Sequence, residues 1–287
     1  MTARLLAMCL AVLASCIQAT SAEASNLDVT LRPLTPWILK QEDNFCALQR
    51  EFGTEGDPFV LSMNSYTPSY NFEFLLGGKA LRPFRSHLLT IAFGGLAPTK
   101  IVRPQAGTSK QYTHILLFSK DVRAAAEREE SLASPADPTF DHKIDRITIA
   151  DMSRNLVIDT GDMHEALTAV RKCMNNLLVT WGLDPDVQAR LRQSAKPTSM
   201  RALARSVQAY YPAGQASLGH QARLNVLVLV DSKGRVNDCK VAQSYNDPAF
   251  NRAACENIRR ATFKPALDAN GAPVDSYWNT TISYSLL

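Results

Sequence analysis

The clearest hydrophobic alternation in the chain runs from residue 222 to residue 231 and predicts a β-strand. Every second residue along this run, and so every residue on one face of the strand, is branched aliphatic: Leu224, Val226, Val228 and Val230. The opposite face begins polar with Arg223 and Asn225 and becomes apolar with Leu227 and Leu229. Because side chains alternate across a strand, this pattern predicts a strand that is half-exposed at its start and covered on both faces at its end.

The residues after this strand predict a second strand, a helix and a third strand. Ser232-Lys233-Gly234 predicts a turn, and residues 236–243 predict the returning strand. Asp247-Pro248 predicts the start of a helix that runs to about residue 261. Asn270-Gly271 predicts a turn before the final strand, residues 276–286. One face of that strand carries Trp278, Ile282, Tyr284 and Leu286, and the other carries Tyr277, Asn279, Thr281 and Ser283.

Residues 25–195 predict a mainly β domain, so the fold class of the whole chain is α+β. Short apolar runs bounded by Gly, Pro, Ser or Asn predict strands over residues 44–52, 59–65, 70–76, 87–93, 113–118, 144–150 and 156–159. Residues 25–36 predict a loose lead-in, and residues 121–131 predict a solvent-facing helix.

A packed helix is predicted at the end of this first domain. The apolar residues that recur at spacings of three and four are Met163, Leu167, Val170, Cys173, Met174, Leu177 and Trp181. Asp162 and Glu165 predict a capping pair at its start, and Gly182 predicts a left-handed cap at its end. A short helix to about residue 192, a polar linker over 193–197 and a helix over 199–209 complete the prediction. The second domain is therefore expected over residues 199–287.

The C-terminal pattern resembles the C-terminal domain of TonB-family proteins, over roughly residues 205–287. The resemblance rests on Tyr211-Pro212, on the hairpin residues 230–236, on Phe-Lys-Pro-Ala at 263–266 and on Asn-Gly-Ala-Pro-Val at 270–274. It implies a small ββαβ domain with an antiparallel sheet in the cell envelope. It also implies protein binding to an outer-membrane transporter, and so a link to transmembrane transport.

The resemblance further implies how a partner would be bound. In TonB-like domains the last long strand is a sheet edge, to which an extended segment adds by β-augmentation. The partner-binding residues implied here are Tyr210, Tyr211, Pro212, Tyr277, Asn279, Thr281 and Ser283. The alternative is an ordinary sheet edge that is covered by a loop or by the second subunit of a homodimer.

The N-terminus has the pattern of an export signal, which places the protein in the periplasm. Residues 1–24 hold one basic residue, an apolar region and the small-x-small site Ala22-Glu23-Ala24, so cleavage is expected before Ser25. The alternative is a lipoprotein signal, in which Cys16 becomes the lipid-anchored N-terminus. A cleaved signal, together with the lack of a long proline-rich spacer, argues against coupling to the proton gradient of the inner membrane.

Four cysteines remain after the predicted cleavage: Cys46, Cys173, Cys239 and Cys255. An even number in an exported protein suggests disulfide bonds, and four cysteines allow three connectivities. Pairing within each domain is the simplest choice, and four buried thiols are the alternative. The sequence contains no Cys-x-x-Cys motif, which weakens zinc and thiol-redox interpretations.

One motif suggests catalysis. Asp159-Thr160-Gly161 follows two apolar residues, as in aspartic proteases, where two such loops share a proton. The sequence contains a single copy of this motif, which weakens the protease interpretation. An envelope hydrolase is therefore only the alternative function, and no catalytic residue is assigned.

The five histidines, His87, His114, His142, His164 and His220, have no metal-ligand spacing. No metal, cofactor or nucleic acid is expected, since the net charge is only +4 and no basic stripe is present.

Overall fold

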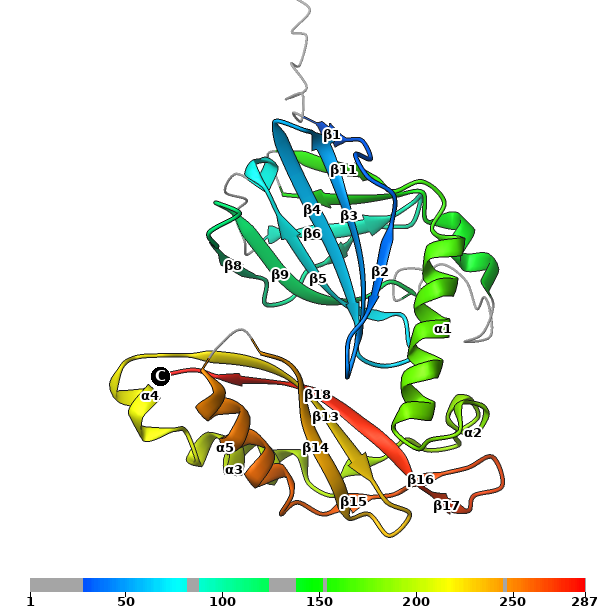
Figure 1. Cartoon of the computed structure of the whole chain (residues 1–287), viewed down its shortest axis with the longest axis vertical. Coiled ribbons are helices and arrows are strands. Elements are labelled where there is room, and N and C mark those ends of the chain that lie inside the picture. The colour runs from blue at the N-terminus through cyan, green and yellow to red at the C-terminus, as the bar shows by residue number, and fades with distance from the viewer. Residues whose placement is uncertain (1–27, 82–87, 124–137, 152–153, 245–246, 287) are drawn as a thin grey trace, which may run out of the picture.

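The computed structural model describes residues 28–81, 88–123, 138–151, 154–244 and 247–286 (Figure 1). The predicted signal peptide, Cys16, His87 and most of the helix predicted over residues 121–131 lie outside these ranges. The fold class is α+β with mainly antiparallel sheets, as the sequence predicts.

Two sheets form the N-terminal part, residues 28–183. The larger sheet is antiparallel and has the order β2 (Ile38–Gln41), β3 (Cys46–Thr54), β4 (Asp57–Ser65), β5 (Asn71–Gly77), β9 (Ile115–Asp121) and β8 (Gln105–Gly107). The smaller sheet has the order β1 (Val29–Leu31), β11 (Asn155–Asp159), β10 (Arg146–Ala150), β6 (Thr90–Phe93) and β7 (Thr99–Lys100). The expectation of a loose lead-in is wrong at residues 29–31, because β1 pairs in parallel with β11.

The first core lies between these sheets. Phe74 of the larger sheet stacks on Phe118 with ring centroids 5.2 Å apart and contacts Phe93 of the smaller sheet at 5.8 Å. Helix α1 (His164–Thr180) contacts β2 and β3, and the Cys46–Cys173 disulfide joins it to β3. The described residues of this region also include the 3-10 helices η1 (Lys79–Leu81) and η4 (Pro138–Lys143), and the short helix α2 (Pro185–Ala189) follows it.

The ends of α1 confirm one cap prediction and correct the other. Gly182 has φ +77°, the left-handed conformation expected of a C-terminal cap. At the start, the N-cap position falls on Met163, which supplies no side-chain hydrogen bond. Asp162 lies one residue earlier, and its carboxylate accepts from the His164 N–H at 2.8 Å. The predicted capping pair is therefore wrong, because the helix begins later than the pattern indicates.

The C-terminal part, residues 195–286, is built on a three-stranded antiparallel sheet. Its order is β14 (Val236–Ser244), β13 (Ala222–Val230) and β18 (Ser276–Tyr284). The helices are α3 (Met200–Ala209), α4 (Ala213–Ser217) and α5 (Pro248–Ile258). Short strand pairs join β12 (Lys196–Pro197) to β15 (Phe263–Lys264), and β16 (Ala266–Leu267) to β17 (Pro273–Val274). The expected linker is thus partly paired with the C-terminal part, and Ala195 is buried in its core.

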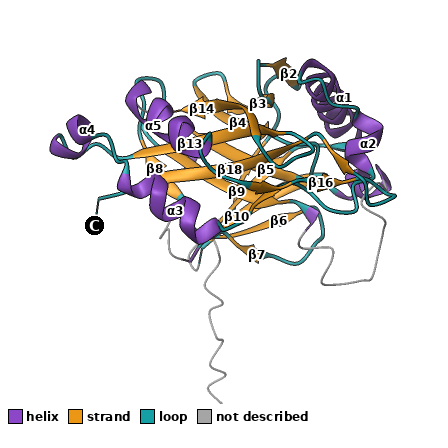
Figure 2. Cartoon of the chain, turned by 90° about the horizontal axis from the view of Figure 1, so that it is seen from below, coloured by secondary structure: helices purple, strands orange, loops and turns teal. Residues whose placement is uncertain are grey.

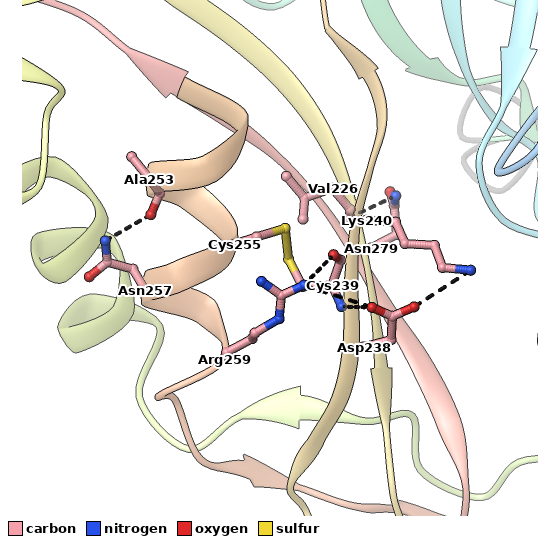
Figure 3. Close-up of a disulfide and its surroundings, with 9 residues drawn as sticks. All are labelled: Val226, Asp238, Cys239, Lys240, Ala253, Cys255, Asn257, Arg259 and Asn279. Atoms are coloured by element: carbon pink, nitrogen blue, oxygen red, sulfur yellow. Dashed lines mark hydrogen bonds and ion pairs between the residues drawn. A yellow bond between two sulfur atoms is a disulfide. The ribbon is translucent and has the colours of Figure 1, made fainter. Parts of the chain in front are cut away.

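One face of the three-stranded sheet forms the second core with the helices. Val226 and Val228 pack there with Phe250 of α5, and the Cys239–Cys255 disulfide joins β14 to α5 (Figure 3). Arg259, at the end of that helix, donates to the Cys239 carbonyl oxygen at 3.3 Å. Both disulfides therefore lie where pairing within each predicted domain places them.

The other face of this sheet packs against the outer face of the larger N-terminal sheet (Figures 1 and 2). Leu227 is buried and joins the hydrophobic cluster of the N-terminal part from outside the larger sheet, and Asn225 is only 2% exposed. The expectation that β13 is half-exposed at its polar start is therefore wrong. Polar residues of the first sheet cover those positions, and polar partners make polar burial tolerable.

Candidate functional site

Strand β18 is an open edge of the three-stranded sheet. All nine of its residues pair with β13, and within the described residues no strand pairs with its other side. An edge of this kind presents unpaired main-chain groups to an incoming strand. The strand implied as the binding edge by the resemblance is thus an edge in the structure.

One contact shows which main-chain groups face this open side. The Gln208 side chain on α3 donates to the Ser283 carbonyl oxygen at 2.7 Å. Because α3 does not lie between the two strands, this carbonyl points away from β13. Main-chain groups alternate in direction along a strand, so those of Thr281 and Asn279 point the same way. Gln208 therefore occupies one end of the edge and leaves the middle open.

The four residues predicted on the final strand differ in their surroundings. Thr281 and Ser283 are exposed, while Tyr277 and Asn279 are half-buried. Tyr277 packs edge-on against Trp181 of the N-terminal part, at 6.1 Å between ring centroids, and burial raises its pKa to about 12. The Thr281 hydroxyl donates to the Asn225 side chain at 2.7 Å. The side chains of this face are therefore directed toward the N-terminal part.

The predicted tyrosine pair before the first strand divides into one exposed and one packed residue. Tyr210 is 54% exposed. Tyr211 packs edge-on against Phe250 and Tyr284, with ring centroids 5.5 Å and 5.4 Å away, and donates to the His220 carbonyl oxygen. Pro212 is half-buried before α4. Tyr211 thus supports the second core, and Tyr210 is the member of the pair that is open to contact.

A groove lies beside the C-terminal end of β18. It has a volume of about 730 Å³ and runs between residues 283–285 and the strands β8 and β9 of the N-terminal part. Its apolar lining includes Leu75, Ile115 and Leu117. The sequence does not predict this groove or Gln208, because neither an exposed polar residue on a helix nor a short strand such as β8 carries a local signal.

The candidate protease motif forms a strand end and a turn. Asp159 is exposed at the end of β11, and its carboxylate accepts from the Gly161 N–H at 3.4 Å. Gly161 has φ +64°, which suits the turn. Arg50 donates to the Thr160 carbonyl oxygen at 3.0 Å. These contacts account for the motif as local structure.

Two of the histidines come together in space. His142 and His164 stack with ring centroids 4.1 Å apart, and His142 Nδ1 lies 2.7 Å from an Asp162 carboxylate oxygen. That hydrogen bond, with the His164 N–H, lowers the pKa of Asp162. Among the described residues, no three potential ligands are grouped so as to hold a metal ion. Within the same ranges, no helix combines the length and apolarity needed to cross a bilayer.

The fold defines a small ββαβ module whose last strand, β18, pairs on one side only within the described residues. Residues 207–286 match the family model for the Gram-negative bacterial TonB protein C-terminal. This match confirms the resemblance over the C-terminal part.

Two solved structures are similar to this segment. One is a TonB C-terminal domain of Pseudomonas aeruginosa, which is 22% identical, with 32% of this chain and 87% of that chain covered and a TM-score of 0.25. The other is a TonB C-terminal domain of Helicobacter pylori, also 22% identical, with 36% and 94% covered and a TM-score of 0.23. No curated protein matches the chain.

Proposed function

We propose that this chain is an exported envelope protein that binds an extended segment of a partner at β18. The domain responsible spans residues 199–287, and the partner is an envelope protein such as an outer-membrane transporter. The TonB C-terminal match supports an envelope role in transport-associated binding. The single observation that carries the binding mode is the open edge of β18, with Thr281 exposed at its centre.

The physical basis is main-chain pairing. An added strand would form hydrogen bonds with the outward groups of Asn279 and Thr281 and extend the sheet beyond β18. Side-chain selection would come from Tyr277, Asn279, Thr281 and Ser283, with Tyr210 and Pro212 nearby by resemblance. Binding of this kind needs no cofactor or catalytic group, and we propose a non-enzymatic role.

The compartment and the domain division belong to the same proposal. Cleavage before Ser25 would release a periplasmic protein with a mainly β domain over residues 25–195. Two disulfides suit an oxidising compartment. The intact mass of the unreduced native protein tests this: a chain starting at Ser25 supports it, and a lipidated Cys16 would make it a tethered lipoprotein.

The edge mechanism is tested with Thr281→Pro, with Thr281→Ala as the matched control. Both changes remove the hydroxyl that contacts Asn225, but only proline removes the outward N–H. The probe is a peptide of about ten residues copied from the periplasm-facing end of an outer-membrane transporter. We expect fluorescence anisotropy to show binding to the alanine variant and none to the proline variant, while circular dichroism shows both folded.

Binding that survives Thr281→Pro would contradict strand addition at β18. A dimer in sedimentation analysis that Thr281→Pro converts to a monomer would show instead that a second copy of the chain covers this edge.

A further inference from the structure

Contacts between the two stacked sheets show what lies beside the C-terminal end of β18. Gln243 of β14 contacts Asn64 of β4 at 3.1 Å. Asn225 of β13 donates to Glu73 of β5 at 3.0 Å, and Arg223 of β13 also reaches Ser119 of β9 at 3.1 Å. At its other end β18 lies near α1, where Tyr277 packs against Trp181. The C-terminal end of β18 therefore lies beside β9 and β8, whose residues line one groove with Ser283 and Ser285.

Strand β8 is itself the last strand of the larger sheet within the described residues. Its residues Gln105, Ala106 and Gly107 are exposed and line the groove of about 730 Å³ opposite Ser283 and Ser285. The two open edges therefore border one groove, at the end of β18 where the Gln208 contact is found.

The chemistry of the groove favours a neutral occupant. Its lining is apolar where β5 and β9 contribute Leu75, Ile115 and Leu117. The lining residues that follow β7 carry no charge: Gln105, Ala106, Gly107, Thr108, Ser109 and Gln111. The one charged lining residue is Arg223, whose Nε lies 3.3 Å from the buried carboxylate of Glu73. A charged side chain entering here would lose water without gaining an ion-pair partner of its own.

We propose that this groove receives the end of the extended partner segment bound at β18. The N-terminal part would then form half of the binding site, and the segment would carry neutral, partly apolar side chains at the alternate positions facing β8 and β9. This inference rests on strand addition at β18 and assigns to the N-terminal part a share in selecting the partner.

The test places a charge in the groove without disturbing a core. Ala106 is exposed on β8, so Ala106→Arg should leave the fold intact, and Ala189→Arg, at an exposed position of α2, is the matched control. The probes are peptides of about ten residues with neutral, lysine or glutamate side chains at alternate positions. We expect the unmodified protein to prefer the neutral peptide.

Ala106→Arg should weaken binding of the neutral peptide by about tenfold or more, because a guanidinium in the groove remains unpaired and blocks it. The Ala106→Glu variant should instead prefer the lysine peptide, because the glutamate can pair with its side chains. This exchange of preference requires direct contact and would not follow from a general loss of structure.

The outcomes separate this inference from the proposed function. If Thr281→Pro abolishes binding while Ala106→Arg and Ala106→Glu bind all three peptides as the unmodified protein does, strand addition stands and the shared groove is wrong. If no peptide binds the unmodified protein, both proposals are wrong.

Discussion

Glu73 and Arg223 form an ion pair between the two sheets, with Arg223 Nε 3.3 Å from the Glu73 carboxylate. Glu73 is 2% exposed and also accepts from Asn225, while the Tyr66 hydroxyl lies 2.9 Å from its other oxygen. A buried charge is tolerated when it is paired and hydrogen-bonded, and all of these partners are present. The ion pair therefore fixes the position of the C-terminal sheet on the N-terminal part.

Replacing Glu73 with alanine should destabilise the protein strongly. It leaves the half-buried Arg223 and the buried Asn225 without their shared acceptor, which we expect to lower the free energy of unfolding by about 3–5 kcal/mol. Urea denaturation measures this change. Glu55→Ala, at an exposed position, is the control and should change stability by less than about 0.5 kcal/mol. A small effect of Glu73→Ala would show that the two parts are not held together by this pair.

Two Tyr→Phe substitutions should change the stability of the protein in opposite directions. The hydroxyl of Tyr284 is buried and has no hydrogen-bond partner among the described residues, so Tyr284→Phe should stabilise the protein by about 1 kcal/mol. The hydroxyl of Tyr66 lies 2.5 Å from a Gln243 oxygen, so Tyr66→Phe should destabilise it by about 1–2 kcal/mol. Thermal or urea unfolding at neutral pH compares the two. Equal effects would contradict the hydrogen-bond assignments.

Tyr284 should also govern stability at alkaline pH. Burial raises its pKa to about 12 from the ordinary 10.0, because the ionised form loses water in the core. The stability that the neutral Tyr284 side chain contributes to the folded protein is therefore fully present below pH 10, and it is lost as the pH rises toward 12. Unfolding measured across this range should show a smaller alkaline loss for Tyr284→Phe than for the unmodified protein. Identical alkaline profiles would contradict the raised pKa.

Removing the Gln208 side chain should lengthen the available edge. Gln208→Ala frees the Ser283 carbonyl oxygen for a partner strand, and one further hydrogen bond of about 1 kcal/mol corresponds to roughly fivefold tighter peptide binding. Titration of the neutral peptide measures this change. Arg205→Ala, at an exposed position of the same helix, serves as the control. Weaker binding by Gln208→Ala would mean that Gln208 contacts the partner itself.

The turn before β14 should tolerate no side chain at Gly234. Its φ is +78°, and an added Cβ would lie 2.1 Å from the Phe263 carbonyl oxygen. Gly271 has a similar φ of +85°, but a Cβ there would be 3.5 Å from its nearest neighbour, the Arg192 side chain. We expect Gly271→Ala to cost about 1–2 kcal/mol for backbone strain alone and Gly234→Ala to cost several times more. Urea unfolding of both variants gives the difference, and equal costs would exclude the clash.

The sequence was sufficient to predict most elements because their signals are local. The alternation from Leu224 to Val230 and the turn at Gly234 depend on neighbouring residues, and the structure confirms both. The start of α1 was predicted too early because Asp162 also fits a cap pattern. The parallel pairing of Val29 with Leu156 was missed, since nothing nearby in the sequence indicates a partner so distant.

The candidate site was only partly predictable for the same reason. The identity of β18 as an edge follows from motif order, so the resemblance supplied it. The polar start of β13 was taken as a sign of exposure, yet Arg223 and Glu73 are 150 residues apart in the chain and meet across the sheets. The groove likewise depends on how two sheets are stacked, and hydrophobic periodicity carries no information on that stacking.

The two disulfides have a consequence for the order in which the protein matures. Each bond joins a cysteine to the next one in the chain, with separations of 127 residues for Cys46–Cys173 and 16 residues for Cys239–Cys255. If the predicted signal is removed, these four are the only cysteines left. If the chain is exported from its amino end and each cysteine is oxidised with the next one to emerge, the native disulfides form directly. Such a chain would need an oxidase but no isomerase.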